Sequence, residues 1–150
     1  MATLNRVALI GFDDTAKSFM NNWQQSLPKV ISAYDIKTEC PSTREAILLQ
    51  YIEYGVQGTF VLEEALSSAQ LIFSFVPNLQ AIDIAKDCAQ YIHKKQLYLD
   101  CSSTSMVVKK QAAHYFERTG LSYIDVAVMP KKTANKKPLS FLFLVKKQNK

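Results

Sequence analysis

The sequence predicts an α/β fold: a single domain built on a doubly wound, mainly parallel sheet with helices on both faces. Three observations indicate this fold. Short apolar runs of strand length recur along the chain, a helical pattern of apolar residues follows most of them, and the connections between the two are short. Strands that alternate with helices in this way pair in parallel through right-handed crossovers. We expect the first strand to be central in the sheet.

The first strand is expected over residues 6–11, because an apolar run there ends in a glycine, as a buried parallel strand does. A helix with N-cap groups at 13–15 follows and runs to about Leu27, where Pro28 ends it. The other strands are expected at 30–36, 58–61, 71–76, 97–101, 121–128 and 138–145. The other helices are expected from a cap at Ser42 or Thr43 through Ile52, at 63–68, from a cap at Asn78 to Ile92, and at 106–119.

Composition places the chain among globular proteins. With 48% hydrophobic and 21% charged residues it is too apolar to be disordered. No run reaches the ~20 apolar residues of a membrane span, and Arg6 interrupts the N-terminal apolar run, which argues against a signal peptide. The three cysteines are an odd number without C-x-x-C spacing, which argues against a disulfide scaffold or a zinc site. We therefore expect a cytoplasmic protein with no membrane segment and no metal.

The net charge of +5 comes from one end of the sequence. From Lys131 onward there are seven lysines and no acid, whereas residues 1–130 carry 11 basic and 13 acidic side chains, a net charge of −2. We expect 1–130 to form the main part of the domain and 131–150 a lysine-rich loop and terminal strand of the same domain. Such lysines attract phosphate, but no aromatic platform or recognition motif accompanies them. A solvated terminus is expected rather than nucleic-acid binding.

Residues that follow the strands matter most for function, because doubly wound sheets bind ligands beyond the carboxyl ends of their strands. After the first strand, Gly11, Asp13 and Ala16 stand at the three positions of the dinucleotide fingerprint G-x-G-x-x-G. Gly11 allows the tight turn, but Asp13 puts a carboxylate at the pyrophosphate position. Two like charges at ~4 Å and an effective dielectric of ~20 repel by ~4 kcal/mol. Alternatively, Asp13 or Asp14 only caps the helix, which is worth ~1 kcal/mol.

The second strand leads to Asp35, 24 residues after Gly11. A carboxylate at this place accepts both ribose hydroxyls of an adenosine and repels a 2′-phosphate, which favours NAD over NADP. A solvated acid at the strand end is the alternative. The cofactor expected from these residues is NAD(P), with binding weakened or lost because of Asp13.

In these features the sequence resembles the N-terminal domain of the β-hydroxyacid dehydrogenases, the family of 3-hydroxyisobutyrate and 6-phosphogluconate dehydrogenases. The stretches that carry the resemblance occur in the family's order over nearly the whole chain: VALIGF (7–12), ISAYDIK (31–37), LIFSFVPN (71–78), LYLDCSS (97–103) and YIDVAVMPKK (123–132). The resemblance implies a Rossmann-type NAD(P)-binding domain. It also implies an all-helical second domain with a catalytic lysine, but the sequence ends at Lys150, before such a helix, and no lysine present matches that motif.

The resemblance implies roles for particular residues. Those implied to bind the cofactor are Gly11, Phe12, Asp13, Asp35, Val76, Pro77, Asn78 and Ser103, and those implied to lie at the substrate are Ser103, Asp125 and Met129. Met129 stands where the family has a serine, and Pro130-Lys131 replace a pair of glycines. We predict no catalytic residue and no metal ligand in this chain.

Two hypotheses about function follow. The first is an NAD(P)-binding domain of an oxidoreductase that is not active alone, because hydride transfer also needs a positioned base. The second is a degenerate module without a cofactor, which serves in protein interaction or has no function. Asp13 and Met129 favour the second hypothesis.

The last expected strand bears on assembly. Residues 139–145 are almost wholly apolar, and an edge strand of this kind is a template for pairing with another chain. Flanking lysines limit open-ended aggregation, so a closed two-fold homodimer is expected. The alternative is that Phe141 and Phe143 are buried within their own subunit.

Overall fold

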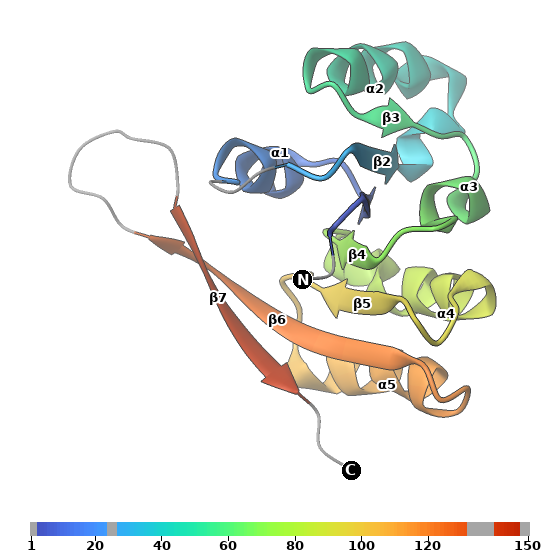
Figure 1. The fold of residues 1–150 in the computed structure, drawn as a ribbon, viewed down its shortest axis with the longest axis vertical. Helices are drawn as coiled ribbons and strands as arrows, with labels where there is room; N and C mark the ends of the chain where they lie inside the picture. Colours follow the sequence, from blue (N-terminus) through green and yellow to red (C-terminus); the bar gives the residue numbers. More distant parts are fainter. Residues whose placement is uncertain (1–2, 24–26, 132–139, 148–150) are drawn as a thin grey trace.

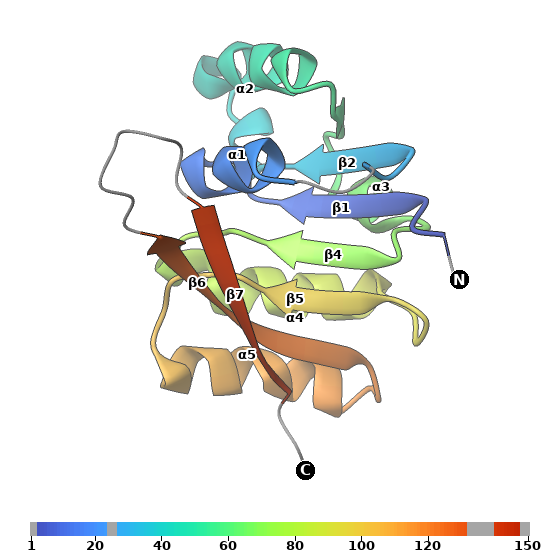
Figure 2. The ribbon, with the colours of Figure 1, turned by 60° about the vertical axis from the view of Figure 1, so that its left-hand side comes forward.

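Seven strands form one sheet in the computed structural model, which describes the backbone of residues 3–23, 27–131 and 140–147 and the side chains of 3–23 and 27–128. The strands are β1 (Arg6–Ile10), β2 (Val30–Tyr34), β3 (Gln57–Gly58), β4 (Leu71–Ser74), β5 (Leu97–Asp100), β6 (Ser122–Lys131) and β7 (Ser140–Lys147). Their order across the sheet is β3-β2-β1-β4-β5-β6-β7 (Figure 1). The first six are parallel, and β7 alone runs antiparallel to its neighbour (Figure 2). The predicted doubly wound α/β fold and the internal position of the first strand are thereby confirmed.

Helices cover both faces of this sheet. The α-helices are α1 (Asp14–Asn21), α2 (Pro41–Glu53), α3 (Leu62–Leu66), α4 (Ala81–Tyr91) and α5 (Met106–Glu117), with 3-10 turns at Ile36–Thr38 and Asn78–Gln80. Residues of α1 and α2 share one core with one face of the sheet, and residues of α3, α4 and α5 share a second core with the other. Among the described residues, no helix is long and apolar enough to cross a membrane.

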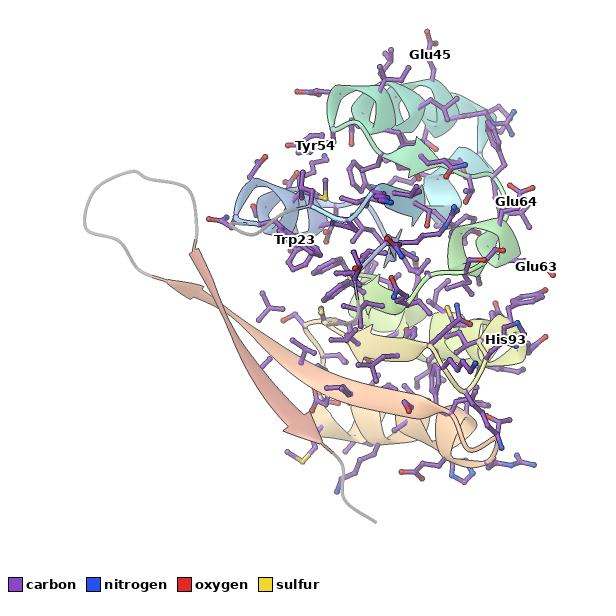
Figure 3. All side chains as sticks on the ribbon, viewed as in Figure 1. Trp23, Glu45, Tyr54, Glu63, Glu64 and His93 are labelled. Atoms are coloured by element: carbon purple, nitrogen blue, oxygen red, sulfur yellow. The ribbon has the colours of Figure 1, made fainter. Side chains whose placement is uncertain are left out.

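The two cores explain why the strands read as continuous apolar runs rather than alternating ones. Successive residues of a strand point to opposite faces, so Val7 and Leu9 of β1 enter the first core while Ala8 and Ile10 enter the second. All four are fully buried, and each large aliphatic side chain contributes about 1.5–3 kcal/mol by its removal from water. On the outer sides of α2 and α3, the exposed side chains of Glu45, Glu63 and Glu64 project away from both cores (Figure 3).

The first helix is shorter than predicted. It ends at Asn21 rather than near Leu27, and residues 24–26 lie outside the described structure. Asn22 forms the C-cap: its backbone N–H and its side-chain Nδ2 both donate to the carbonyl oxygen of Ser18, the latter at 2.7 Å. Consecutive asparagines have low helix propensity and satisfy the terminal carbonyls themselves, so the helix stops before the proline.

Two predicted helix caps are wrong. The helix expected from Ser42 or Thr43 begins at Pro41, whose missing N–H and fixed φ suit a first helical position, and Thr43 Oγ1 donates to Lys37 O at 2.7 Å. Asn78 does not cap the long helix, which begins at Ala81; it opens a 3-10 turn, and its side chain accepts a hydrogen bond from Thr104.

Several strand and helix bounds also differ from the predictions. The second strand ends at Tyr34, because the Asp35 side chain accepts from Lys37 N at 2.9 Å and turns the chain. The third strand is only Gln57–Gly58, and the helix after it is Leu62–Leu66.

The C-terminal hairpin pairs residues 124–131 of β6 with 140–147 of β7. The predicted terminal strand is therefore confirmed as a strand of the same sheet, shifted by two residues and placed at the edge. The lysine-rich loop at 132–139 and the side chains from Met129 onward lie outside the described residues. The alternative that Phe141 and Phe143 are buried within their own subunit concerns side chains in that undescribed part.

The raised pKa values of buried tyrosines and a buried cysteine predict how the free energy of unfolding depends on pH. Burial raises the pKa of Tyr34, Tyr51, Tyr98 and Tyr123, and likewise that of Cys88. Unfolded tyrosine loses its proton near pH ~10, while the folded side chains still hold theirs. The stability that these groups contribute is therefore fully present below the unfolded pKa values and is lost progressively as the pH rises from those values toward the folded ones.

We expect the free energy of unfolding in urea to fall between about pH 8 and about pH 10.5. The fall should be smaller in Tyr51→Phe, whose wild-type hydroxyl has no hydrogen-bond partner among the described residues. Ultraviolet absorbance of tyrosinate gives an independent measure. Full titration of all seven tyrosines in the folded protein, with no loss of stability, would contradict the prediction.

Candidate functional site

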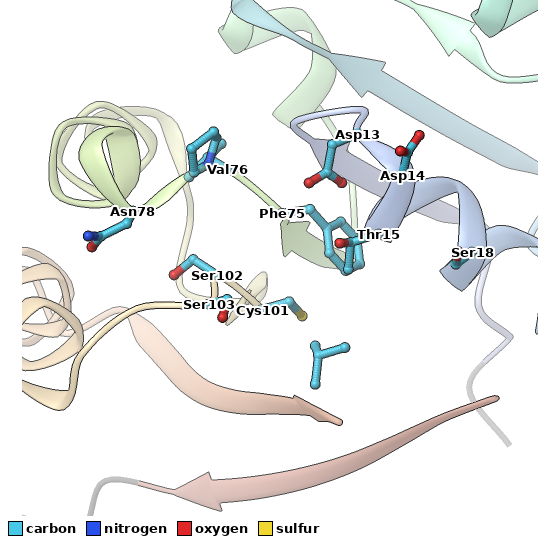
Figure 4. Close-up of a pocket in the computed structure, with 12 residues that line it drawn as sticks. Asp13, Asp14, Thr15, Ser18, Phe75, Val76, Asn78, Cys101, Ser102 and Ser103 are labelled. Carbon is cyan, nitrogen blue, oxygen red and sulfur yellow. The ribbon is translucent and has the colours of Figure 1, made fainter. Parts of the chain in front are cut away.

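The sheet has its topological switch point between β1 and β4. The chain leaves β1 for α1 on one face and leaves β4 for α4 on the other, so the carboxyl ends of the two strands diverge into a crevice, where doubly wound sheets bind their ligands. Two cavities lie there, which we call the main cleft, about 350 Å³, and the side pocket, about 110 Å³. The main cleft is lined by Asp13, Asp14, Thr15, Ser18, Phe75, Val76, Pro77, Asn78, Cys101, Ser102, Ser103 and Val128 (Figure 4).

Gly11 forms the bottom of the crevice. Its φ of +82° lies in the left-handed region, which favours glycine. A Cβ at this position would lie 3.1 Å from the backbone carbon of Phe75 and 3.1 Å from the backbone nitrogen of Val76. Its own N–H donates to Tyr34 O at 2.8 Å. The turn after β1 is therefore closed against the ends of both neighbouring strands, and a larger residue there would require the backbone of 75–76 to shift.

Asp35 connects the ends of β1 and β2. Its carboxylate is buried, with Oδ2 accepting from Phe12 N at 2.8 Å and Oδ1 accepting from Lys37 N at 2.9 Å. Asp35 also lines the side pocket together with Gly11 and Lys37. The alternative of a solvated strand-end acid does not hold, because the side chain is part of the structure of the turn.

Phe12 is placed differently from the other residues of the first turn. Its ring is buried and packs against Tyr51 and Tyr54, with ring centroids 5.2 Å and 5.6 Å apart. Its N–H is already bonded to Asp35. Phe12 therefore anchors the turn to α2 rather than presenting a side chain to the crevice.

Asp13 lies where the two cavities meet and lines both. Its Oδ1 accepts from Ala16 N at 2.9 Å, so it is the N-cap of α1, as one of the sequence interpretations predicted. The N-terminus of a helix is also the place where an anion binds best. The protein's own carboxylate thus occupies the N-terminus of α1.

The electrostatics of the main cleft are unusual for a site of this geometry. Among the described residues that line it, the charged ones are Asp13 and Asp14, and none is a lysine or arginine. The side pocket adds Asp35 and one cation, Lys37. The cleft can accept hydrogen bonds and bury apolar surface, but it opposes a second negative charge.

The far wall of the main cleft is the loop 101–105, which follows β5. Ser103 lies on it and is exposed, across the cleft from the start of α1 (Figure 4). Thr104 Oγ1 donates to Asn78 Oδ1, so the loop is joined to the chain that follows β4. Cys101 is buried beside them, and burial raises the pKa of its thiol, which keeps it protonated and unreactive.

A third cavity of about 300 Å³, the rear pocket, adjoins the main cleft and shares Cys101, Ser102, Ser103 and Val128 with it. Asp125 lines it and is paired with Lys109, whose Nζ lies 2.5 Å from Asp125 Oδ1. Sequence reasoning missed Lys109, because a single lysine within a helix has the pattern of a solvated surface residue. The side chain of Met129 lies outside the described residues.

The structure therefore brings most of the predicted site residues to one end of the sheet. Gly11, Asp13, Asp35, Val76, Pro77, Asn78 and Ser103 all line the main cleft or the side pocket. Asp125 lies in the adjoining rear pocket, and Phe12 lies beneath the first turn.

Comparison with known proteins gives one family match. The family model described as the NAD binding domain of 6-phosphogluconate dehydrogenase matches residues 25–146. The matched region includes Asp35, the chain after β4 and the loop 101–105, but it begins after the first turn and α1. None of the curated proteins matches the sequence.

Solved structures share the fold. A conserved hypothetical protein from Sinorhizobium meliloti 1021 is 21% identical, with a TM-score of 0.77 over 87% of this chain and 43% of its own. The 3-hydroxyisobutyrate dehydrogenase of Mycobacterium tuberculosis, solved with L-serine, is 16% identical, with a TM-score of 0.67 over 85% of this chain and 41% of its own. An imine reductase from Myxococcus stipitatus in complex with NADP+ is 13% identical, with a TM-score of 0.63 over 83% of this chain and 41% of its own. The chain spans less than half the length of each.

Two glycines with positive φ provide a test of the close packing at the first turn. Gly11→Ala should lower the free energy of unfolding by about 3 kcal/mol, from left-handed strain and from contact with backbone that cannot move aside. Gly55→Ala is the matched control, since a Cβ there meets nothing within 4 Å, and it should cost about 1 kcal/mol from strain alone. If both variants lose the same free energy of unfolding in urea, the close approach of Gly11 to the end of β4 does not contribute to the loss.

Proposed function

Because the chain belongs to the family of the NAD-binding domain of 6-phosphogluconate dehydrogenase, we propose that it binds a nicotinamide dinucleotide across the main cleft and the side pocket. The observation that carries the proposal is the crevice at the switch point of a sheet in the order 3-2-1-4-5-6, closed by Gly11. The adenosine ribose is placed in the side pocket, beside Asp35. The nicotinamide end is placed toward Asn78 and Ser103.

Asp35 supports NAD rather than NADP as the preferred ligand. Both carboxylate oxygens accept one backbone N–H each, and a carboxylate oxygen can accept a further hydrogen bond. Ribose hydroxyls can supply it, whereas a 2′-phosphate is repelled. Lys37 is the one cation among the described residues lining the side pocket, and it reduces that repulsion. We therefore propose a modest preference for NAD.

The fit of the pyrophosphate is poorer than the fit of the ribose. Asp13 holds the Ala16 amide that a phosphate would use, and it adds like charge at the same place. The proposed affinity is accordingly weak. If binding is absent altogether, the second hypothesis holds: a module of this fold without a cofactor, which serves in protein interaction or has no function. Asp13 is the specific residue that favours it.

Bound NAD would supply a hydride acceptor, and a hydroxyacid substrate is proposed to lie toward the rear pocket, near Ser103, Asp125 and Met129. The chain offers little to move the substrate proton. Lys109 is the only amine among the described residues lining the main cleft and rear pocket, and its three donors already have acceptors. We propose that these 150 residues alone do not catalyse hydride transfer.

Calorimetric titration of NAD, NADH, NADP and NADPH tests the proposed ligand and the role of Asp13. Asp13→Asn keeps a side-chain oxygen for Ala16 N but removes the charge, so we expect it to strengthen NAD binding by about one to three powers of ten. Asp13→Gly should act in the same direction. Glu117→Gln, at the exposed opposite end of α5, is the control and should leave the affinity unchanged. Equal affinity in Asp13→Asn and the wild type would show that the charge of Asp13 does not limit NAD binding.

The edge position of β7 supports the proposal of a homodimer. Eight residues of β7 pair with β6 on one side, and no described strand pairs with β7 on the other. A second copy of the chain can satisfy these backbone groups through a two-fold axis and cover both edges together. Light scattering at tens of micromolar should give the mass of a dimer. A monodisperse monomer would contradict the proposal.

A further inference from the structure

A buried lysine joins three elements behind the loop 101–105. Lys109 lies in α5 and is 6% exposed. Its Nζ donates to Asp100 O at 3.0 Å, to Asp125 Oδ1 at 2.5 Å and to Val126 O at 3.1 Å. An ammonium group has three donors, so none remains for a ligand. Lys109 therefore acts on the ends of β5 and β6 and not on a bound molecule.

Asp100 connects this lysine to the loop. The main-chain oxygen of Asp100 is held by Lys109, and its buried carboxylate is held from both sides. Oδ1 accepts from Ser102 N at 2.9 Å and from the Ser102 hydroxyl, and Oδ2 accepts from Tyr123 OH at 2.6 Å. The position of Ser102 thus depends on an aspartate at the end of β5, which pairs with β4 and β6 and whose main-chain oxygen also accepts from Lys109.

The start of the loop is also held by Cys101, whose N–H donates to Ser74 O at 2.9 Å and whose side chain is buried in the core shared with α1 and α2. Residues 101–105 have no regular secondary structure, and the loop passes directly into α5, which Ser105 caps by accepting from Val108 N at 3.4 Å. On its other side the loop reaches the chain after β4 through the Thr104–Asn78 hydrogen bond. One end of the loop is therefore held by Asp100 and Cys101, and the other by the helix that carries Lys109. By contrast, the first turn is held by Asp35 and Gly11, which these contacts do not involve.

We propose that Lys109 is a positioning residue that holds the loop 101–105 in place and thereby shapes the nicotinamide half of the site. The role rests on the proposed dinucleotide function. It assigns the two halves of the ligand to independent supports: Asp35 and Gly11 for the adenosine half, and Lys109 with Asp100 for the half near Ser103 and Asn78.

The binding experiment compares a whole dinucleotide with its adenosine half. Lys109→Met should weaken NADH binding by about tenfold, because the loop contacts lose their fixed geometry. It should leave the affinity for adenosine 5′-monophosphate within about twofold, because Asp35 and Gly11 are untouched. Lys110→Met, its exposed neighbour on α5, is the matched control and should change neither. Equal loss of both ligands in Lys109→Met, or loss of neither, would overturn the proposal.

Hydrogen exchange tests the positioning without any ligand. The Ser102 amide is bonded to Asp100 and the Phe12 amide to Asp35, so they form a matched pair on the two sides of the crevice. In Lys109→Met the Ser102 amide should exchange faster, whereas the Phe12 amide should keep its wild-type rate. Faster exchange at both sites would indicate general destabilisation and overturn the proposal.

Two provisions keep the outcomes distinct. If Lys109→Met does not fold, Asp125→Asn removes one charge of the pair and keeps an oxygen acceptor, and the same comparison of Ser102 with Phe12 is made in it. If the wild type binds neither NADH nor adenosine 5′-monophosphate, the proposed function fails. The exchange experiment still decides whether Lys109 holds the loop.

Discussion

The approach of the first turn to the end of β4 is the constraint on which the site depends. A Cβ on Gly11 would lie 3.1 Å from the backbone of Phe75 and Val76, closer than side chains normally approach. This contact brings the turn after β1 against the chain after β4, directly at the switch point of the sheet. The start of α1, the buried Phe12 and the bond from its amide to Asp35 belong to the same turn.

Asp13 shows how one residue can serve the fold at the expense of a ligand. A helix N-terminus needs an acceptor, and in this fold a pyrophosphate can provide it. Here the side chain of Asp13 provides it, so α1 is capped without any bound molecule. An N-cap is worth about 1 kcal/mol, whereas the like charge that it places in the cleft opposes binding by more than that. The crevice thus carries negative charge at the helix N-terminus, where this fold can bind an anion.

Two hydrogen-bond networks lie on opposite sides of the crevice. Asp35 satisfies backbone amides on the side of β1 and β2, and Asp100 and Lys109 satisfy donors and acceptors on the side of β5 and β6. Buried charges of this kind carry a desolvation cost, and removing one partner leaves the other uncompensated, so each network resists rearrangement. Two fixed walls around an open cleft are what a preformed binding site requires.

The sequence by itself determined the sheet, its helices and the residues at the strand ends, because apolar periodicity and glycine at a turn are local properties of the chain. Gly11, Asp35 and Asn78 could therefore be predicted to lie at one edge of the sheet. Only the tertiary structure decided which partner each polar side chain takes. Asn78 bonds to Thr104 instead of capping a helix, and Lys109 is buried among acceptors of β5 and β6. Such partners come from distant parts of the chain, and a hydrogen bond depends on distance and direction that no local pattern encodes.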